Sequence, residues 1–483
     1  MTDTVSQLCK LLEPFNTNGT VLSAATDIST DLNIDSVTVM DFVMEVEDHF
    51  DIEIPLNVLS ETRTVADLAK VVETRTKKGE GMDLLAKLEA VAHRHERMKS
   101  LGADAVGVVN DKILSPTRAL IDGRETILAG TNNYMGITFD AECIAAGQKA
   151  LAEFGTGTTG SRIANGSFAL HKDLETEFAR FLDRKHCIVF TTGYQANLGM
   201  MSGIAGPRDT IYLDADSHSS IYDGCTLSGA KLVRFRHNDA ADLDKRLSRG
   251  EDDGGGKLVV LEGIYSMMGD RAPLADFIEV KKKHGFQLLV DEAHSFGVLG
   301  PHGRGLADEA GLEKDVDFVV GTFSKSVGAI GGFGAGDHPY FEYLRFAMRP
   351  YMFTASSSPA SIATSIAAIR KLAAEPQRRR KLAENSARLF NGFKALGLEL
   401  GCDQVSPVVA VRCPDEPSTI AMWNALLKAG VYVNIALPPG TPNKLCLLRC
   451  SVSAAHSDAE IDRIIELFGS VVAQGHGKKV VNG

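Results

Sequence analysis

The sequence lacks long apolar runs, a leading hydrophobic segment and paired cysteine motifs. Although 44% of its 483 residues are hydrophobic, no run reaches the roughly 18 residues that a membrane span needs. Met1 opens a polar segment rather than a signal peptide, and the eight cysteines form no Cys-x-x-Cys pair. Thiols scattered in this way are typical of a reducing compartment. We therefore expect a globular cytoplasmic protein without a transmembrane segment.

Several catalytic motifs are also missing. The sequence has no Gly-x-x-x-x-Gly-Lys-Ser/Thr phosphate loop, no His-Glu-x-x-His and no Gly-x-Ser-x-Gly. Asp291-Glu-Ala-His has the spelling of a helicase box, but without a phosphate loop it does not predict a nucleotide-driven motor. The spacing of possible ligands supports no metal site.

Positive charge is scarce at the N-terminal end. Residues 1–75 hold 14 Asp and Glu but only four Lys and Arg, whereas the rest of the chain holds 48 acids and 47 bases. Nearly all of the net charge of −11 therefore lies in the first 75 residues, and such asymmetry indicates a separate module. Because neither part is basic, nucleic acid is not expected as a partner.

The acidic module has the pattern of a small helical bundle. Apolar residues recur at helical spacing from Val37 to Phe50, with Asp35 where an N-cap is expected. Pro55 breaks the chain, and a second short helix is expected to start at Thr64. The polar, glycine-containing residues 77–84 indicate a linker that lets the module move while tethered.

The stretch Leu32-Asn-Ile-Asp-Ser-Val, followed by Phe42 to Pro55, resembles an acyl carrier protein around its Asp-Ser-Leu motif, with Val37 in place of leucine. The resemblance implies an all-α carrier bundle over residues 1–76. It also implies that Ser36 carries a 4′-phosphopantetheine arm, attached by a phosphopantetheinyl transferase and loaded by a separate acyl-loading enzyme. Acidic residues such as Glu45 and Glu47 would then face basic partner surfaces.

From about residue 105 onward, short apolar runs alternate with longer amphipathic ones, as in an α/β fold with a mainly parallel sheet. The expected strands are Cys187–Phe190, Thr210–Leu213, Lys231–Phe235, Lys257–Leu261, Gln287–Val290 and Val316–Val320. Ionisable residues follow four of these strands, where active sites of such sheets lie; they are Asp214, Asp216, His218, Glu262, Asp291, His294 and Lys325. A lysine in the glycine-rich turn that begins at Gly321 suggests a Schiff base.

Four stretches then identify the family: those beginning Thr158-Thr-Gly-Ser-Arg, Asp214-Ala-Asp-Ser-His, Asp291-Glu-Ala-His-Ser and Gly321-Thr-Phe-Ser-Lys. They resemble the α-oxoamine synthases, fold-type I pyridoxal-phosphate enzymes that join an amino acid to an acyl thioester with loss of CO₂. Leu261-Glu-Gly-Ile-Tyr-Ser-Met-Met-Gly-Asp and Leu447-Leu-Arg-Cys-Ser are most similar to the bacterial serine palmitoyltransferases of this family. The resemblance implies a mainly parallel large domain and a smaller C-terminal α+β domain over residues 85–475, with 476–483 as a tail.

By this resemblance, Lys325 forms the internal aldimine and later removes the α-proton. Asp291 pairs with the pyridinium nitrogen, His218 stacks on the ring, and His294, with Ser266 as a second candidate, contacts the phenolic oxygen. The resemblance further implies phosphate donors at Gly193, Tyr194, Thr322 and Ser324, and at Thr354 of a second subunit, which makes the protein a homodimer. Arg449, assisted by Asn132, would hold the amino-acid carboxylate.

The predicted reaction is the decarboxylative condensation of L-serine with an acyl thioester, giving a 2-amino-3-ketone of the 3-ketosphinganine type for sphingolipid synthesis. The thioester would come from the phosphopantetheine of the chain's own or a partner carrier. One residue departs from the serine enzymes, because Leu437 stands where their Arg-Pro-Pro-x-Thr-Pro loop begins with arginine. This departure leaves open L-alanine or glycine as the substrate. A non-catalytic carrier scaffold is the alternative from another class.

Overall fold

The computed structural model describes residues 3–28, 30–32, 34, 36–50, 52, 54, 62–76, 85–104, 107–250, 254–438, 440–441 and 444–474. The chain divides into two compact units, Met1–Glu96 and Arg97–Gly483. The expected linker 77–84, the tail 476–483, the cap position Asp35 and the break at Pro55 lie outside the described residues.

The first unit is a small helical bundle, as its periodicity predicts. Its helices are α1 (Asp3–Leu12), α2 (Ser36–Phe50) and α4 (Val65–Thr76). One apolar face of each helix packs into a common core that includes Leu8, Phe42 and Leu68, all of them fully or almost fully buried. Phe42 also packs edge-on against Phe15, with ring centroids 5.7 Å apart. The bundle therefore has its own core, and α2 begins at Ser36.

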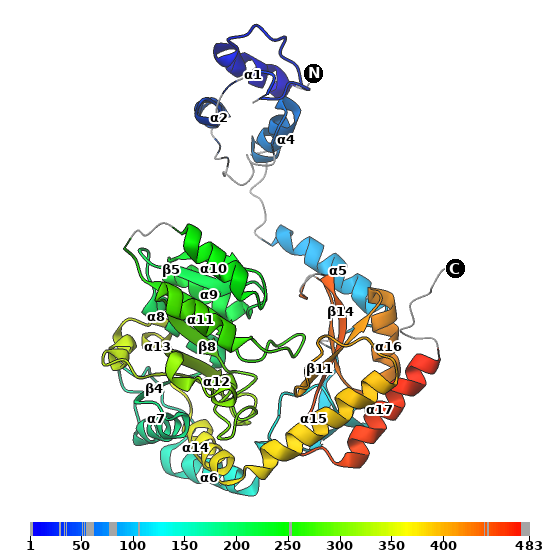
Figure 1. Ribbon diagram of the computed structural model, residues 1–483. Helices are drawn as coiled ribbons and strands as arrows, with labels where there is room; N and C mark the ends of the chain where they lie inside the picture. Colours follow the sequence, from blue (N-terminus) through cyan, green and yellow to red (C-terminus); the bar gives the residue numbers. More distant parts are fainter. Residues whose placement is uncertain are drawn as a thin grey trace. The chain divides into compact units, whose positions relative to one another are not determined.

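The second unit is built on a seven-stranded sheet of order β4-β10-β9-β8-β7-β5-β6 (Figure 1). All neighbouring strands are parallel except β10, which runs antiparallel to β4 and β9. All six expected strands are confirmed, and β10 is an addition. The strands are β4 (His186–Phe190), β5 (Thr210–Asp214), β6 (Lys231–Phe235), β7 (Lys257–Glu262), β8 (Gln287–Asp291), β9 (Phe318–Thr322) and β10 (Gly332–Gly336).

Helices cover both faces of this sheet, because alternate side chains along each strand point to opposite faces. Val259 and Val290 pack with Phe277 of α11 in one core, whereas Val260 and Leu289 belong to a second core with Met200 of α8. The helices of this region are α6 (Ala141–Phe154), α7 (Ala169–Leu182), α8 (Gly193–Ile204), α9 (Ser219–Ser228), α10 (Ala240–Arg249), α11 (Leu274–His284), α12 (Leu306–Ala310), α13 (Arg349–Met352) and α14 (Pro359–Ala374).

A smaller α+β lobe completes the second unit, as expected (Figure 1). Its sheets have the orders β1-β2-β3-β12 and β11-β14-β13, so the segment before the large sheet pairs with the C-terminal segment. The strands are β1 (Asn110–Ser115), β2 (Arg118–Ile121), β3 (Arg124–Leu128), β11 (Val408–Cys413), β12 (Val431–Tyr432), β13 (Asn434–Ala436) and β14 (Cys446–Ser451). The helices are α15 (Gln377–Ala395), α16 (Glu416–Lys428) and α17 (Asp458–Ala473), while α5 (Glu89–Ser100) spans the division between the units.

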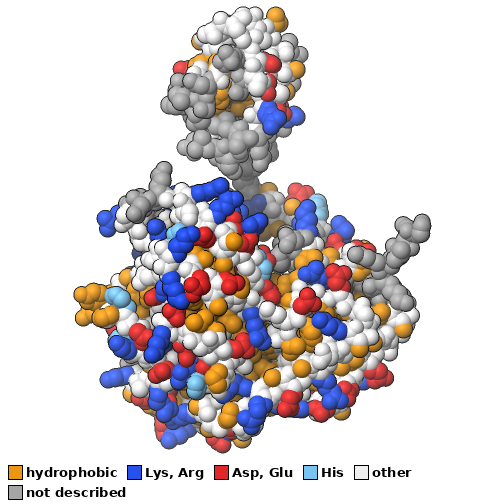
Figure 2. All heavy atoms as spheres, viewed as in Figure 1, with side chains coloured by type: hydrophobic (Ala, Val, Ile, Leu, Met, Phe, Trp, Pro, Cys, Tyr) orange, Lys and Arg blue, Asp and Glu red, His pale blue; other side chains and the backbone are white. Residues whose placement is uncertain are grey.

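The surface of the second unit mixes both signs of charge. On the face in Figure 2, Lys and Arg lie among Asp and Glu over the whole of this unit. This agrees with the near balance of acids and bases after residue 75. Among the described residues, no helix combines the length and apolarity required to cross a membrane.

We expect the two units to lose their structure independently, because each has its own core. Phe42→Ala should destabilise the first unit by about 3–5 kcal/mol, the usual cost of emptying a buried phenylalanine site. Hydrogen exchange followed by mass spectrometry should then show faster exchange in α1, α2 and α4 only. Phe277→Ala is the matched control and should speed exchange in the second unit only. Equal loss of protection in both units for either variant would contradict two separate cores.

Candidate active site

Two adjoining cavities lie at the carboxyl ends of the parallel strands and share His218, His294 and Lys325 in their walls. The smaller, of about 330 Å³, is also lined by Gly193, Tyr194, Asn197, Glu262, Asp291, Thr322 and Ser324. The larger, of about 640 Å³, is also lined by Asn132, Asp216, His237, Ser266, Asp270 and Arg449. The structure thus brings together every site residue expected from the sequence in the second unit, apart from Thr354.

Lys325 lies between the two cavities, in the turn that follows β9. Removal of its amine from water lowers the pKa of Lys325 to about 8, although the carboxylates of Asp291 and Glu262 oppose this change. A lysine with this pKa is a nucleophile and a base near neutral pH, as a Schiff-base lysine must be.

Asp291 ends β8 and is 4% exposed. A carboxylate so little hydrated needs donors, and it has two: the Ala293 amide at 2.9 Å and Asn197 Nδ2 at 2.7 Å. Asn197 Nδ2 also donates to Ser220 Oγ at 3.0 Å, and Ser220 Oγ lies 2.8 Å from His218 Nδ1. One buried asparagine of α8 therefore connects Asp291 with His218.

His218 precedes α9 and caps it, since its Nδ1 accepts the Ser220 amide at 3.2 Å. With Nδ1 occupied as an acceptor, the neutral ring carries its proton on Nε2. Burial lowers the pKa of His218. The negative charge of Asp291 opposes this change but has the smaller effect. The ring itself forms part of both cavity walls.

His294 contacts Tyr134, with 2.6 Å between the tyrosine oxygen and His294 Nδ1. Both side chains are buried, and burial holds the pKa of His294 well below its ordinary value and raises that of Tyr134 to about 12. A protonated tyrosine donating to Nδ1 leaves the His294 proton on Nε2. His294 can therefore donate a hydrogen bond from Nε2 to an oxygen in the cavity.

Arg449 of β14 brings a buried cation to the larger cavity. Its Nε donates to the Ser266 carbonyl at 2.5 Å, Nη1 to Ser451 Oγ at 3.0 Å and Nη2 to Asn132 Oδ1 at 3.2 Å. Among the described residues, the hydrogen-bond acceptors of this guanidinium are all neutral, so its charge remains available to an anionic ligand. This arrangement fits a carboxylate-binding site and explains why Asn132 and Ser266 lie beside it.

The N-terminus of α8 forms the opposite end of the smaller cavity. Thr192 caps this helix, accepting the Gln195 amide at 3.1 Å, so Gly193 and Tyr194 begin it. A Cβ on Gly193 would lie 2.7 Å from the Thr322 side chain, and glycine is therefore required for this close approach. Thr322 Oγ1 and Ser324 Oγ lie 2.9 Å apart beside it. Hydroxyls and helix amides of this kind are suited to a phosphate.

Glu262 is a second carboxyl group next to Asp291. It ends β7, is 4% exposed and accepts the His218 amide. Burial raises its pKa well above the ordinary value, and the neighbouring charge of Asp291 adds to the increase. Two adjacent buried carboxyl groups do not both ionise readily, so the raised pKa of Glu262 limits the repulsion between them.

Thr354 lies outside the two cavities, where its Oγ1 accepts Gln195 Nε2 at 3.2 Å. Its segment is held by Ser356, whose amide donates to the Gly160 carbonyl at 2.9 Å and whose Oγ lies 2.7 Å from Thr158 Oγ1. The Thr158–Phe168 motif and the Thr354 segment are therefore fixed to each other.

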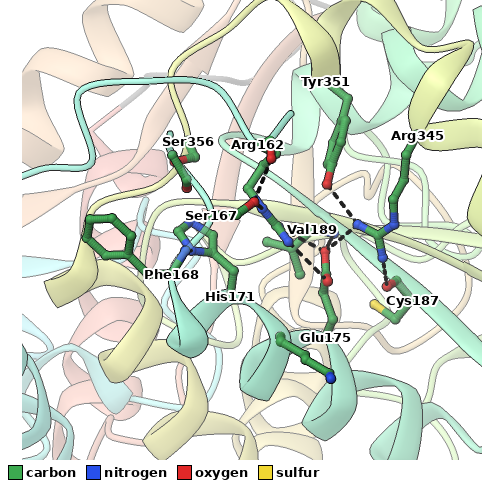
Figure 3. A network of polar contacts seen from close by, with 12 residues as sticks. Arg162, Ser167, Phe168, His171, Glu175, Cys187, Val189, Arg345, Tyr351 and Ser356 are labelled. Carbon is green, nitrogen blue, oxygen red and sulfur yellow. Dashed lines mark hydrogen bonds and ion pairs between the residues drawn. The ribbon is translucent and has the colours of Figure 1, made fainter. Parts of the chain in front are cut away.

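A buried glutamate anchors both segments (Figure 3). Glu175 of α7 accepts Arg162 Nη1 at 2.9 Å, Arg345 Nη1 at 2.8 Å and the Val189 amide at 3.2 Å. Arg345 Nη1 also donates to Tyr351 Oη at 2.8 Å. Burial opposes ionisation of Glu175, but the two arginines outweigh this effect and keep its pKa below the ordinary value. The glutamate thus joins residues before α7 to residues before α14.

Sequence reasoning missed Asn197, Ser220, Tyr134 and Glu175. Asn197 and Glu175 lie inside helices. From the sequence alone, a single polar residue in a helix is predicted to be exposed to solvent, because its neighbours in space are not known. A signal was available for Tyr134, because Asn132-Asn-Tyr is a polar and aromatic cluster between apolar segments.

The comparisons with known proteins agree with this geometry. The family model for aminotransferase class I and II matches residues 125–468, and that for a phosphopantetheine attachment site matches residues 4–72. The serine palmitoyltransferase of Caulobacter vibrioides is 55% identical over 81% of this chain and 97% of its own length.

Solved structures show the same relationship. The serine palmitoyltransferase of Sphingomonas wittichii is 54% identical, with a TM-score of 0.80 over 81% of this chain and 99% of that one. Another serine palmitoyltransferase structure, which holds pyridoxal phosphate, is 49% identical, with a TM-score of 0.80 and the same coverage.

The residues present fit pyridoxal phosphate. The smaller cavity offers a lysine amine of lowered pKa, a buried carboxylate for a ring nitrogen and a cradle between Gly193 and Thr322 that a Cβ would fill. The cofactors of the chain are pyridoxal phosphate in this cavity and 4′-phosphopantetheine in the first unit.

Asn197→Leu should weaken the binding of pyridoxal phosphate about tenfold, because a hydrogen bond to a charged group contributes roughly 1.5–3 kcal/mol. The measurement is the dissociation constant from titration of cofactor-free protein. Asn385→Leu is the control, since Asn385 is equally buried but donates to the carbonyls of Ser453 and His456. An unchanged constant in the folded Asn197 variant would show that Asp291 does not depend on this amide.

Glu175→Gln should destabilise the second unit by about 3–5 kcal/mol at pH 7, because Arg162 would lose its counter-charge and Arg345 would retain the pair with Glu342 alone among the described residues. Since the pKa of Glu175 is lowered by folding, the wild-type contribution is complete above the unfolded pKa and disappears as the pH falls. Denaturant unfolding at pH 7 and pH 4 measures both effects. Glu177→Gln, which removes pairs with the exposed Arg180 and Arg370, should cost under about 1 kcal/mol.

Proposed function

We propose that this chain, which belongs to the aminotransferase class I and II family and carries a phosphopantetheine attachment domain, condenses L-serine with an acyl thioester. The products are CO₂ and a 2-amino-3-ketone of the 3-ketosphinganine type. The observation that carries this proposal is the Arg449 guanidinium, held by neutral groups in the cavity that also contains the Lys325 amine. Relatives with the name serine palmitoyltransferase support serine as the amino acid.

Pyridoxal phosphate supplies an electron sink for the charge that develops at the amino-acid α-carbon. Lys325 would hold the cofactor, and its amine would then serve as the base that removes the α-proton of the bound amino acid. With a pKa of about 8, this amine is available as a base near neutral pH.

The surrounding side chains orient the cofactor and stabilise charge. Asp291 would accept a hydrogen bond from the ring nitrogen of the cofactor, and Asn197 holds the Asp291 carboxylate in place. His218 would stack on the cofactor ring. His294 would donate from Nε2 to the phenolic oxygen, because Tyr134 contacts its other nitrogen. Each role uses a hydrogen-bond donor or acceptor of the side chain that is not already occupied by a contact within the protein.

The cofactor phosphate would accept hydrogen bonds from the Gly193 and Tyr194 amides and from the hydroxyls of Thr322 and Ser324. We place Thr354 at the phosphate of the partner's site, since its segment lies outside the cavities of its own chain. The enzyme is then a homodimer, in which the contacts of Glu175 set the position of Thr354.

The substrate carboxylate binds Arg449, assisted by Asn132. Leu437 offers no second cation here, so carboxylate recognition rests on one buried guanidinium. This feature supports the second candidate substrates, L-alanine and glycine, because a single arginine contacts only what all three amino acids share.

The acyl group arrives on the phosphopantetheine of Ser36, which acts as a flexible thiol arm. A phosphopantetheinyl transferase attaches the arm, and a separate enzyme loads it. We place this chemistry in the cytoplasm, since all eight cysteines of the chain are free thiols.

Condensation assays with L-serine, L-alanine and glycine test the proposal, using acyl-CoA and the acylated chain as donors. We expect turnover with L-serine, and Ser36→Ala should abolish turnover from the loaded chain while leaving turnover from acyl-CoA. Thr38→Ala, two residues away, is the control. Turnover with L-alanine or glycine alone would favour the second candidates. If the protein with bound cofactor turned over none of the three amino acids, the result would favour the non-catalytic carrier scaffold instead.

A further inference from the structure

We propose that His237 is a positioning residue that joins the end of β5 to the loop containing Ser266 and thereby sets the place of Arg449. The inference rests on the proposed function, because it concerns the binding of an amino-acid carboxylate. His237 follows β6 and does not belong to the groups that hold the cofactor.

The imidazole bridges two carboxylates from separate segments. His237 Nδ1 lies 2.8 Å from Asp214 Oδ1, at the end of β5, and Nε2 lies 2.7 Å from Asp270 Oδ2, beyond β7. Since both partners accept hydrogen bonds only, both ring nitrogens must carry protons. The result is an imidazolium between two carboxylates, with the Asp214 side chain fully buried and that of Asp270 16% exposed.

Asn238 strengthens the same link. Its amide donates to Asp214 Oδ2 at 2.8 Å, and its Nδ2 donates to Asp270 Oδ2 at 2.7 Å and to the Arg271 carbonyl at 3.2 Å. Asn238 adopts a left-handed backbone conformation, with φ of 53°, which costs energy in a residue with a side chain. His237 and Asn238 therefore both form hydrogen bonds with Asp214 and Asp270.

The two carboxylates hold different segments that line the cavity, although of the two only Asp270 lines it directly. Asp214 also accepts the Asp216 amide at 2.9 Å and so fixes the start of the segment that leads to His218. Asp270 ends the loop that contains Ser266, whose carbonyl accepts Arg449 Nε. A chain of contacts thus runs from His237 through Asp270 and the Ser266 loop to the guanidinium.

The charges around His237 keep it protonated across the neutral range. Burial disfavours the charge, but hydrogen bonds to Asp214 and Asp270 outweigh burial and raise the pKa of His237 to about 10. Asp216 adds a further carboxyl, and the Tyr265 ring packs edge-on at 4.5 Å. Neutralising one carboxylate should bring this pKa down toward neutrality, so that His237 loses its charge as the pH rises.

His237→Gln should raise the KM for the amino acid by about tenfold to a hundredfold, the usual effect of a slightly misplaced binding group. The affinity for pyridoxal phosphate should stay within about twofold, because His237 and Asp270 line the larger cavity and not the smaller one assigned to the cofactor. His302→Gln is the control, since it removes one histidine–aspartate contact of 2.8 Å, to Asp308, and should leave both constants unchanged.

Asp270→Asn supplies a readout that loss of structure alone would not give. In this variant, amino-acid affinity should fall as the pH rises from 6 to 8.5, whereas wild type should lack this step. Affinity is followed by the change that the amino acid produces in the absorbance of the holoenzyme, which needs no turnover. This binding signal therefore tests His237 even if condensation itself fails. An unchanged amino-acid affinity in folded His237→Gln, or pH profiles of Asp270→Asn that match wild type, would overturn the inference.

Discussion

The synthase cavity depends on one charge, the carboxylate of Asp291, kept in a place with very little water. Burying an isolated carboxylate is costly unless donors replace its hydration. Here the donors are a backbone amide and the Asn197 side chain, with the Lys325 amine nearby. The same asparagine reaches Ser220 and, through it, His218. Asp291 and His218 are thus linked through one residue of α8, the helix whose N-terminus lines the same cavity.

A second constraint is that like charges must be kept apart within the same cavity. The raised pKa of Glu262 reduces its repulsion with Asp291. Asp214 and Asp270 share the protonated His237, whose pKa they raise. Arg449 is held by neutral oxygen atoms and so retains an uncompensated charge. Within the part of the site that the structure describes, Arg449 is therefore a cation available to a ligand.

The sequence was most informative where a chemical signal coincided with a strand end. Six strands were predicted from apolar runs, and the ionisable residues after them line the two cavities, apart from the buried Asp214. β10 escaped notice because three of its five residues are glycine, which removes the apolar pattern. Those glycines are required by packing, since a Cβ on Gly334 would lie 2.5 Å from the Met200 sulfur. Asn197 and His237 could not be recognised because their roles depend on partners that are distant in sequence.

The pairing of β3 with β12 has a consequence for the order in which the protein matures. Val431 and Tyr432 align with Ile127 and Leu128, and Arg118 of β2 forms an ion pair with Glu460 of α17. The lobe that presents Arg449 therefore needs both ends of the synthase sequence before it can close. During synthesis, the N-terminal bundle has all its core residues long before that point. The carrier bundle can therefore fold while the synthase still lacks its C-terminal strands, so the two parts of one polypeptide reach their folded states at different times.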